Sequence, residues 1–270
     1  MKNRRRSDGT AVFATVAVGL AFVALVVTTA VSFGWLGGSS TEAGGELGDG
    51  RSGDSDRAVA DPSADPAEIV RSAAAAMRAV TSVEFELQRS GAPVFIDQFE
   101  SIALTELRGQ FTVPNKAQAE LTVRINDNLN TKLGAVAVDA EVWISNPVTG
   151  DFETLPTGYD IDPSKFFDPE NGWRPLLTEL RDVALVGIED RGGERYHVRG
   201  IAPATQVSEI TVGLVRGQDV PIDLWIHPDT KLVTSAEFTT VIDDAEATWA
   251  LSLDHYGDTF TINPPENVTG

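Results

Sequence analysis

The sequence predicts an α+β protein in which an opening helix precedes a large antiparallel β-sheet, and helices from mid-chain cover one face of that sheet. Apolar residues recur at helical spacing directly after Asp65, and from Val83 onward they alternate with polar residues over several short segments. Short polar turns separate many of these segments, which is typical of an antiparallel meander with one buried face. A long uncharged segment near the N-terminus further predicts one transmembrane helix before the folded domain.

Residues 1–10 form a basic tail, and residues 11–36 form an apolar segment longer than the roughly 20 residues that span a bilayer. We expect an uncleaved signal anchor with the basic tail in the cytoplasm and the following domain extracytoplasmic, in a single-pass protein of the cell membrane. A cleaved signal peptide is the alternative. The segment is long for a signal peptide, and Thr28-Thr29-Ala30 is a mediocre cleavage site.

Residues 37–65 are predicted to be a disordered acidic stalk. They contain few large apolar side chains, so they cannot bury enough surface to offset the entropy lost on ordering. Residues 66–270 are enough for one domain with a large core.

The composition excludes several classes of function. The 21 Lys and Arg residues against 40 Asp and Glu residues give a net charge of −19. This balance argues against nucleic-acid binding, because phosphate contacts need clustered basic side chains. The chain has no cysteine, which excludes disulfides, thiolate metal sites, a cysteine nucleophile and an anchor built on an acylated cysteine.

The first element of the domain is a helix with Asp65 as its N-cap and Pro66 in its first position. Strict alternation then predicts strands at 83–87, 121–125, 220–226 and 247–253. Less regular strands are expected at 102–113, 133–144, 185–189, 196–199 and 232–241. Two Asp-Pro steps interrupt the strands at mid-chain and lead into a helix that carries Trp173, Leu176, Leu177 and Leu180 on one face. A further helix is expected at 205–215.

Catalytic signatures are missing from the sequence. It contains no H-E-x-x-H, no G-x-S-x-G, no P-loop and no G-x-G-x-x-G. His197, His227 and His255 are interpreted as surface or strand residues. The acidic residues around the two Asp-Pro steps are interpreted as helix caps in preference to paired carboxylates for acid–base catalysis. We therefore expect no enzymatic activity, no metal and no cofactor.

Four segments of the domain carry a resemblance to a known family. They are Phe167-Asp168-Pro169-Glu170-Asn171-Gly172 before Leu176-Leu177, Tyr196-His197-Val198-Arg199-Gly200, Val220-Pro221-Ile222-Asp223-Leu224-Trp225-Ile226-His227-Pro228-Asp229-Thr230, and Tyr256-Gly257 before Pro264-Pro265. With the order of elements from about Pro66 to Val268, they resemble the LppX/LprG-type (LppX/LprAFG) envelope lipid-carrier lipoproteins of mycobacteria. Those proteins are related in architecture to the LolA and LolB carriers.

The resemblance implies a strongly curved antiparallel sheet, or half-barrel, whose concave face is covered by helices and encloses an apolar cavity for acyl chains. It also implies an acylated lipid or glycolipid as the ligand. Many family members begin with an acylated cysteine that holds them to the membrane. This chain has none, so the helix at 11–36 would replace that anchor.

We predict a membrane-anchored extracytoplasmic lipid-binding protein that holds acyl chains for envelope lipid transport or presentation, with a membrane transporter or another envelope protein as its partner. The alternative is a non-enzymatic sensor or scaffold domain that binds a partner protein in envelope signalling. The predicted lining residues are the large apolar ones of the alternating strands and the mid-chain helix: Phe85, Leu87, Leu121, Val123, Phe166, Phe167, Trp173, Leu177, Leu224, Ile226, Trp249 and Leu251. Trp173 and Trp225 are alternatively expected at the cavity mouth, where an amphipathic ring suits a wet edge.

Overall fold

The computed structural model describes residues 59–96, 100–125, 129–139, 141–147, 149–154, 173–211, 213 and 215–269. The predicted basic tail and membrane anchor lie outside these residues, as do most of the predicted stalk and both Phe166 and Phe167. The chain divides into two units, Met1–Asp54 and Ser55–Gly270, and the described fold belongs to the second. Within the described ranges, no helix has both the length and the apolar composition that a membrane crossing requires.

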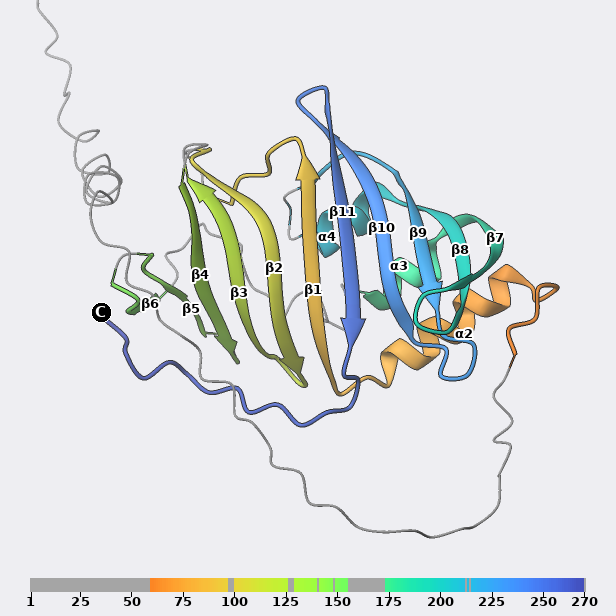
Figure 1. The fold of residues 1–270 in the computed structure, drawn as a ribbon, viewed down its shortest axis with the longest axis horizontal. Coiled ribbons are helices and arrows are strands. Elements are labelled where there is room, and N and C mark those ends of the chain that lie inside the picture. The colour runs from red at the N-terminus through yellow and green to blue at the C-terminus, as the bar shows by residue number, and fades with distance from the viewer. Residues whose placement is uncertain are drawn as a thin grey trace, which may run out of the picture. The chain divides into compact units, whose positions relative to one another are not determined.

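One antiparallel sheet of 11 strands dominates the fold (Figure 1). Its strands lie in the order β6-β5-β4-β3-β2-β1-β11-β10-β9-β8-β7. Their bounds are β1 Ser82–Gly91, β2 Ile102–Thr112, β3 Lys116–Ile125, β4 Leu129–Val138, β5 Glu141–Ser145, β6 Phe152–Thr154, β7 Arg181–Asp190, β8 Glu194–Ala202, β9 Val220–Ile226, β10 Val233–Ile242 and β11 Ala245–Asp254. Two meanders, β1–β6 and β7–β11, therefore meet where β1 pairs with β11.

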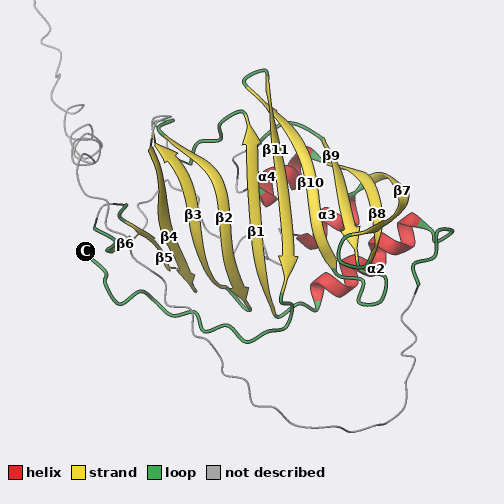
Figure 2. Ribbon diagram, in the orientation of Figure 1, coloured by secondary structure: helices red, strands yellow, loops and turns green. Residues whose placement is uncertain are grey.

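Three described helices lie on one side of the sheet, behind β8–β11 in the view of Figure 2. They are α2 Pro66–Arg78, α3 Trp173–Glu179 and α4 Ala204–Ile210. Helix α2 starts where predicted, because the Asp65 side chain accepts a hydrogen bond from the Ala67 backbone N–H and proline occupies the first turn. Arg78 in the last turn complements the negative end of the helix dipole.

The two faces of the sheet differ in what they carry. We call the face that bears Phe85, Leu87 and Leu121 the inner face, and the opposite one the outer face. The buried side chains of α2, including Ile69 and Met77, join the inner face in a single apolar cluster. The main core therefore lies between the helices and the inner face.

The end of the chain supports the far edge of the sheet. Ile262 is buried in a small cluster on the outer face with Val138 and Trp143. Further on, the Phe152 backbone N–H donates to Asn267 O at 2.8 Å, and Thr269 N–H donates to Phe152 O at 2.8 Å. The C-terminal segment thus pairs with β6, the last strand on that side.

The helix at Pro66 and the predicted strands are present, with three corrections. The strand predicted at 133–144 is two strands, because the chain turns at Asp139, which has a φ of 58°. Strand β6 was not predicted, because its three residues depend on the distant C-terminal segment for pairing. The helix predicted at 205–215 ends at Ile210, where the Thr211 hydroxyl donates to Val207 O and accepts from Val215 N–H.

Candidate functional site

A continuous apolar row crosses the inner face from β4 to β8. Each member lies opposite the next in the register of neighbouring strands. The members of this leucine row are Leu133, Leu121, Leu107, Leu87, Leu251, Ala236, Leu224 and Val198. All of them are buried. Side chains on one face of a sheet alternate with the opposite face, so this row follows directly from the two-residue period of the sequence.

The inner face is lined by small side chains on β3 and β4. Ala117 lies opposite Ala137, and Ala119 lies opposite Ala135. On the neighbouring strand, a Cβ added to Gly109 would lie 2.3 Å from Gln118 O and 2.7 Å from the Phe85 ring. Glycine is therefore required at this position for β2 to approach β3 and for the Phe85 ring to lie over the strand.

The structure brings nine of the twelve predicted lining residues into one buried apolar cluster on the inner face and helix α3. They are Phe85, Leu87, Leu121, Val123, Leu177, Leu224, Ile226, Trp249 and Leu251. Phe166 and Phe167 lie outside the described residues. Trp173 is the first residue of α3, and its side chain is likewise outside the description. Whether these residues contact a ligand stays a prediction.

The cation Arg89 interrupts the apolar inner face. Arg89 lies opposite Trp249 in the register of β1 and β11, and its guanidinium carbon is 4.7 Å from the centroid of the Trp249 ring. Its Nη1 donates to Leu104 O at 2.7 Å, and its Nη2 donates to Ala92 O. Burial, together with repulsion from Arg124, lowers the pKa of Arg89 to about 10. The side chain therefore remains charged at neutral pH.

The outer face of β7–β9 holds a polar cluster around His197, which is only 7% exposed. Its Nδ1 lies 2.6 Å from Glu189 Oε1, and its Nε2 lies 2.6 Å from Asp223 Oδ1. Both ring nitrogens therefore lie within hydrogen-bond distance of a carboxylate oxygen, one from β7 and one from β9. The imidazole also stacks on Trp225, with 4.6 Å between ring centroids.

Arginines complete this cluster. Arg199 makes a bidentate contact with Asp223, at 2.9 and 3.0 Å, and Arg191 lies 3.4 Å above the Trp225 ring centroid. Burial raises the pKa of Asp223, but the hydrogen bonds from Arg199 and His197 outweigh it and hold the pKa below its ordinary value. The hydrogen bond from the Trp225 indole is the main cause of a lowered pKa at Glu189.

The sequence analysis predicted neither the position of Arg89 on the inner face nor the polar cluster around His197 on the outer face. His197 lies on strand β8, as expected for a strand residue, but it is buried and hydrogen-bonded, and Trp225 stacks on it from the outer face of β9. The alternation of β8 and β9 could have predicted this cluster. Side chains of successive residues point to opposite faces, so His197 and Trp225 share the face opposite Leu224. In the part of the chain that the structure describes, no group of three or more His, Asp or Glu side chains is placed to hold a metal ion.

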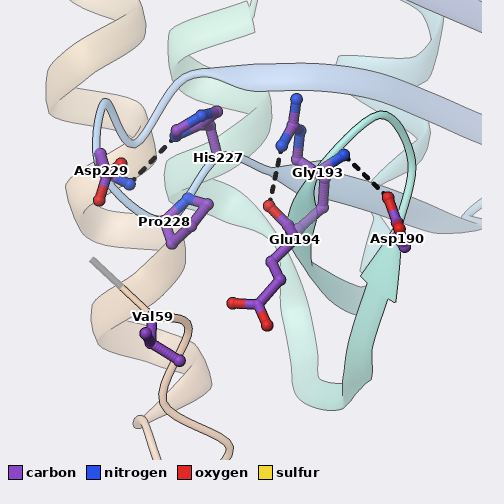
Figure 3. A pocket seen from close by; sticks show the side chains of 8 residues that line it. Val59, Asp190, Gly193, Glu194, His227, Pro228 and Asp229 are labelled. Atoms are coloured by element: carbon purple, nitrogen blue, oxygen red, sulfur yellow. Dashed lines mark hydrogen bonds between the residues drawn. The ribbon is translucent and has the colours of Figure 1, made fainter. Parts of the chain in front are cut away.

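A pocket of about 300 Å³ lies beside Val59, between the turn that joins β7 to β8 and the turn that follows β9 (Figure 3). It is lined by Val59, Asp190, Gly193, Glu194, Arg195, His227, Pro228 and Asp229. The backbone N–H of Ala60 donates to Glu194 Oε2 at 3.1 Å, and that of Asp61 donates to Tyr196 OH at 2.9 Å. Five of its eight lining residues carry polar or charged side chains, which does not suit an acyl chain. These contacts instead attach residues 60 and 61 to β8.

Comparisons with known proteins agree on one family. A family model described as LppX_LprAFG lipoprotein matches residues 65–262. Lipoprotein LprA of Mycobacterium tuberculosis is 24% identical over 200 residues, which cover 72% of this chain and 77% of that protein.

Two solved structures have a similar fold. The crystal structure of LprF from Mycobacterium bovis matches with a TM-score of 0.60 and 17% identity, over 76% of this chain and 99% of LprF. That of Mycobacterium tuberculosis lipoprotein LppX matches with a TM-score of 0.52 and 14% identity, over 73% of this chain and 98% of LppX.

Proposed function

The chain belongs to the LppX_LprAFG lipoprotein family, and from this premise we propose that it is a carrier that holds the acyl chains of a lipid against the inner face of its sheet. The leucine row is the observation that carries this proposal. It gives an unbroken apolar surface from β4 to β8, along which an acyl chain could lie. Each methylene that leaves water for such a surface contributes about 0.8 kcal/mol to binding.

The small side chains of β3 and β4 favour the same proposal. Ala119 and Ala135 fill less volume than the leucines of the adjoining row, so the inner face recedes on these strands. A ligand site for an apolar molecule is concave and mostly apolar, with few polar groups. We propose that the cavity lies over this part of the sheet and that the twelve predicted residues line it, Phe166, Phe167 and Trp173 included.

Membrane attachment is a separate part of the proposal. The family is named for lipoproteins, yet none of the 270 residues is a cysteine that an acyl chain could modify. We propose that residues 11–36 anchor the protein as a single transmembrane helix and that residues 37–65 form a stalk. The domain would then work outside the cytoplasmic membrane, transporting or presenting an envelope lipid.

The first test asks whether the protein carries lipid. The full chain is purified in a detergent without acyl chains, extracted with organic solvent and analysed by mass spectrometry. We expect stoichiometric acyl lipid in the extract. A chain that yields no lipid, and that takes up none when lipid is added, would contradict the proposal and favour the sensor or scaffold alternative.

Two substitutions at adjacent residues test whether the acyl-chain site lies on the inner face of the sheet. Val123 is fully buried on the inner face of β3, whereas Thr122 faces outward on the same strand. We expect Val123→Trp to lower the retained lipid about tenfold, because the indole fills the volume of at least two methylenes. The control Thr122→Trp should leave retention unchanged. Melting curves of both variants establish that they are folded, and equal retention in the two would contradict the assignment of the site to the inner face.

A further inference from the structure

Arg89 is a charged residue on the otherwise apolar inner face. It follows Leu87 by two residues in β1, so its side chain lies beside the leucine row. Its immediate neighbours across the strands are Trp249 and then Phe238. The guanidinium is therefore set at the border of the surface on which we propose that acyl chains lie.

Among the residues that the structure describes, no acidic side chain neutralises the charge of Arg89. Within the described part of the chain its contacts are two backbone carbonyls and one aromatic ring, and no carboxylate forms an ion pair with it. The charge of Arg124 repels it, and burial disfavours its charged form further. A half-buried cation without an anion is unfavourable, and proteins usually pair such groups.

Arg108 on the neighbouring strand provides the contrast. It faces outward, where its Nη2 lies 2.9 Å from Glu106 and 3.2 Å from Glu86. The chain has 40 acidic residues for 21 basic ones, so partners for cations are plentiful. Within the described ranges, the lack of a carboxylate partner at Arg89 therefore distinguishes it from Arg108 and does not follow from composition.

The guanidinium of Arg89 also has N–H groups that are not used in its hydrogen bonds to the two carbonyls. It offers five N–H groups, of which the two carbonyls engage two, and its Nε has no hydrogen-bond partner. Holding two carbonyls needs only neutral donors, which a glutamine could supply. What a neutral side chain could not supply is the positive charge, and phosphate or carboxylate groups are the anions that a guanidinium recognises best.

We propose that Arg89 binds the anionic group, a phosphate diester or a carboxylate, of a lipid whose acyl chains lie along the leucine row. The inference rests on the proposed function and extends it, because it assigns the ligand to the anionic lipids. Leu87 and Leu251 would contact the chains next to the head group. The indole of Trp249 would hold the guanidinium in position from its other side.

A competition experiment measures whether the protein prefers an anionic lipid to a neutral one. The full chain in detergent is incubated with an equimolar mixture of dioleoyl phosphatidylglycerol and dioleoylglycerol, repurified and analysed for retained lipid by mass spectrometry. A second arm uses oleate against methyl oleate, which separates carboxylate from phosphate recognition. The ratio of the two lipids is compared between variants, so unequal partition into the detergent cancels.

We expect the wild type to retain one of the anionic lipids in about tenfold or greater excess over its neutral counterpart, as charge-assisted hydrogen bonds predict. In Arg89→Gln the ratio should fall to near unity while the neutral lipid is still retained. Arg89→Lys keeps the charge and should keep most of the preference. Arg108→Gln removes the same charge from the outer face of the next strand and should match the wild type.

Three outcomes would overturn the inference. If the wild type and Arg89→Gln retain anionic and neutral lipid in the same ratio, Arg89 does not select anionic lipids, but the proposed function is not contradicted. A parallel loss of both lipids in Arg89→Gln and Arg89→Lys assigns Arg89 a structural role in holding Ala92 and Leu104. Retention of no lipid by the wild type overturns the inference and the proposed function together.

Discussion

Adjacent residues of strand β9 illustrate how differently the two faces of the sheet are held. Leu224 on the inner face is completely buried among apolar side chains, whereas Asp223 on the outer face is bonded to His197 and Arg199. The inner face gains stability from area removed from water, which does not depend on pH and is not screened by salt. The outer face gains it from charge-assisted hydrogen bonds, which depend on both. One strand thus has two kinds of stability, and each can be perturbed separately.

The largest effect should come from the inner face. Leu224→Ala deletes buried methyl groups between Ala236 and Val198, and we expect a loss of about 2–5 kcal/mol in the free energy of unfolding. Urea unfolding followed by tryptophan fluorescence measures it. A loss below about 1 kcal/mol would mean that the site collapses easily, and that the inner face here is less tightly packed than its burial indicates.

An intermediate effect that depends on pH should come from Asp223. Its pKa in the folded protein is lowered from 3.8, so its stabilising contribution is present above about pH 4 and is lost as the pH falls through the lower folded value. Asp223→Asn should be less stable than the wild type at pH 7 and should lose less stability between pH 5 and pH 3. Unfolding curves at several pH values test this. Parallel pH profiles for the two proteins would exclude Asp223 as a source of the acid sensitivity.

The smallest effect should come from an exposed ion pair on the outer face. Lys132 lies 2.6 Å from Glu120, but their side chains are 66% and 54% exposed. Water and salt screen such a pair, so Lys132→Ala should change the free energy of unfolding by at most about 0.5 kcal/mol. The same urea titration provides the measurement. A larger loss would show that the ion pairs of β3 and β4 act as a network, and it would weaken the contrast between the faces.

The period of the sequence was sufficient to predict most strands and to group the apolar residues that share one face of a strand. Alternation placed Leu87, Leu121, Leu224 and Leu251 correctly on one buried face, because a residue's side is determined by its numbering along a strand. The N-cap at Asp65 likewise located the start of α2. These are local properties, and they are readable from neighbouring residues.

Features that depend on distant partners could not be predicted in this way. Strand β6 exists because Phe152 meets Val268, more than a hundred residues later. The cluster at His197 requires β7, β8 and β9 to be adjacent, and the exceptional position of Arg89 is apparent only when β11 lies beside β1. The sequence shows an arginine after an alternating run, but it does not indicate whether a carboxylate lies within reach.

The pairing of β1 with β11 also has a consequence for how the protein folds. It joins Glu84 to Asp254 in the middle of the sheet, so the central seam links the two ends of the folded domain. Local hairpins can form quickly, whereas contacts at this sequence separation form slowly. During synthesis, β1 therefore has an unpaired edge until the final strand has left the ribosome. A chain that stops before Ala245 would leave two separate meanders, each exposing a strand edge on which other chains could aggregate.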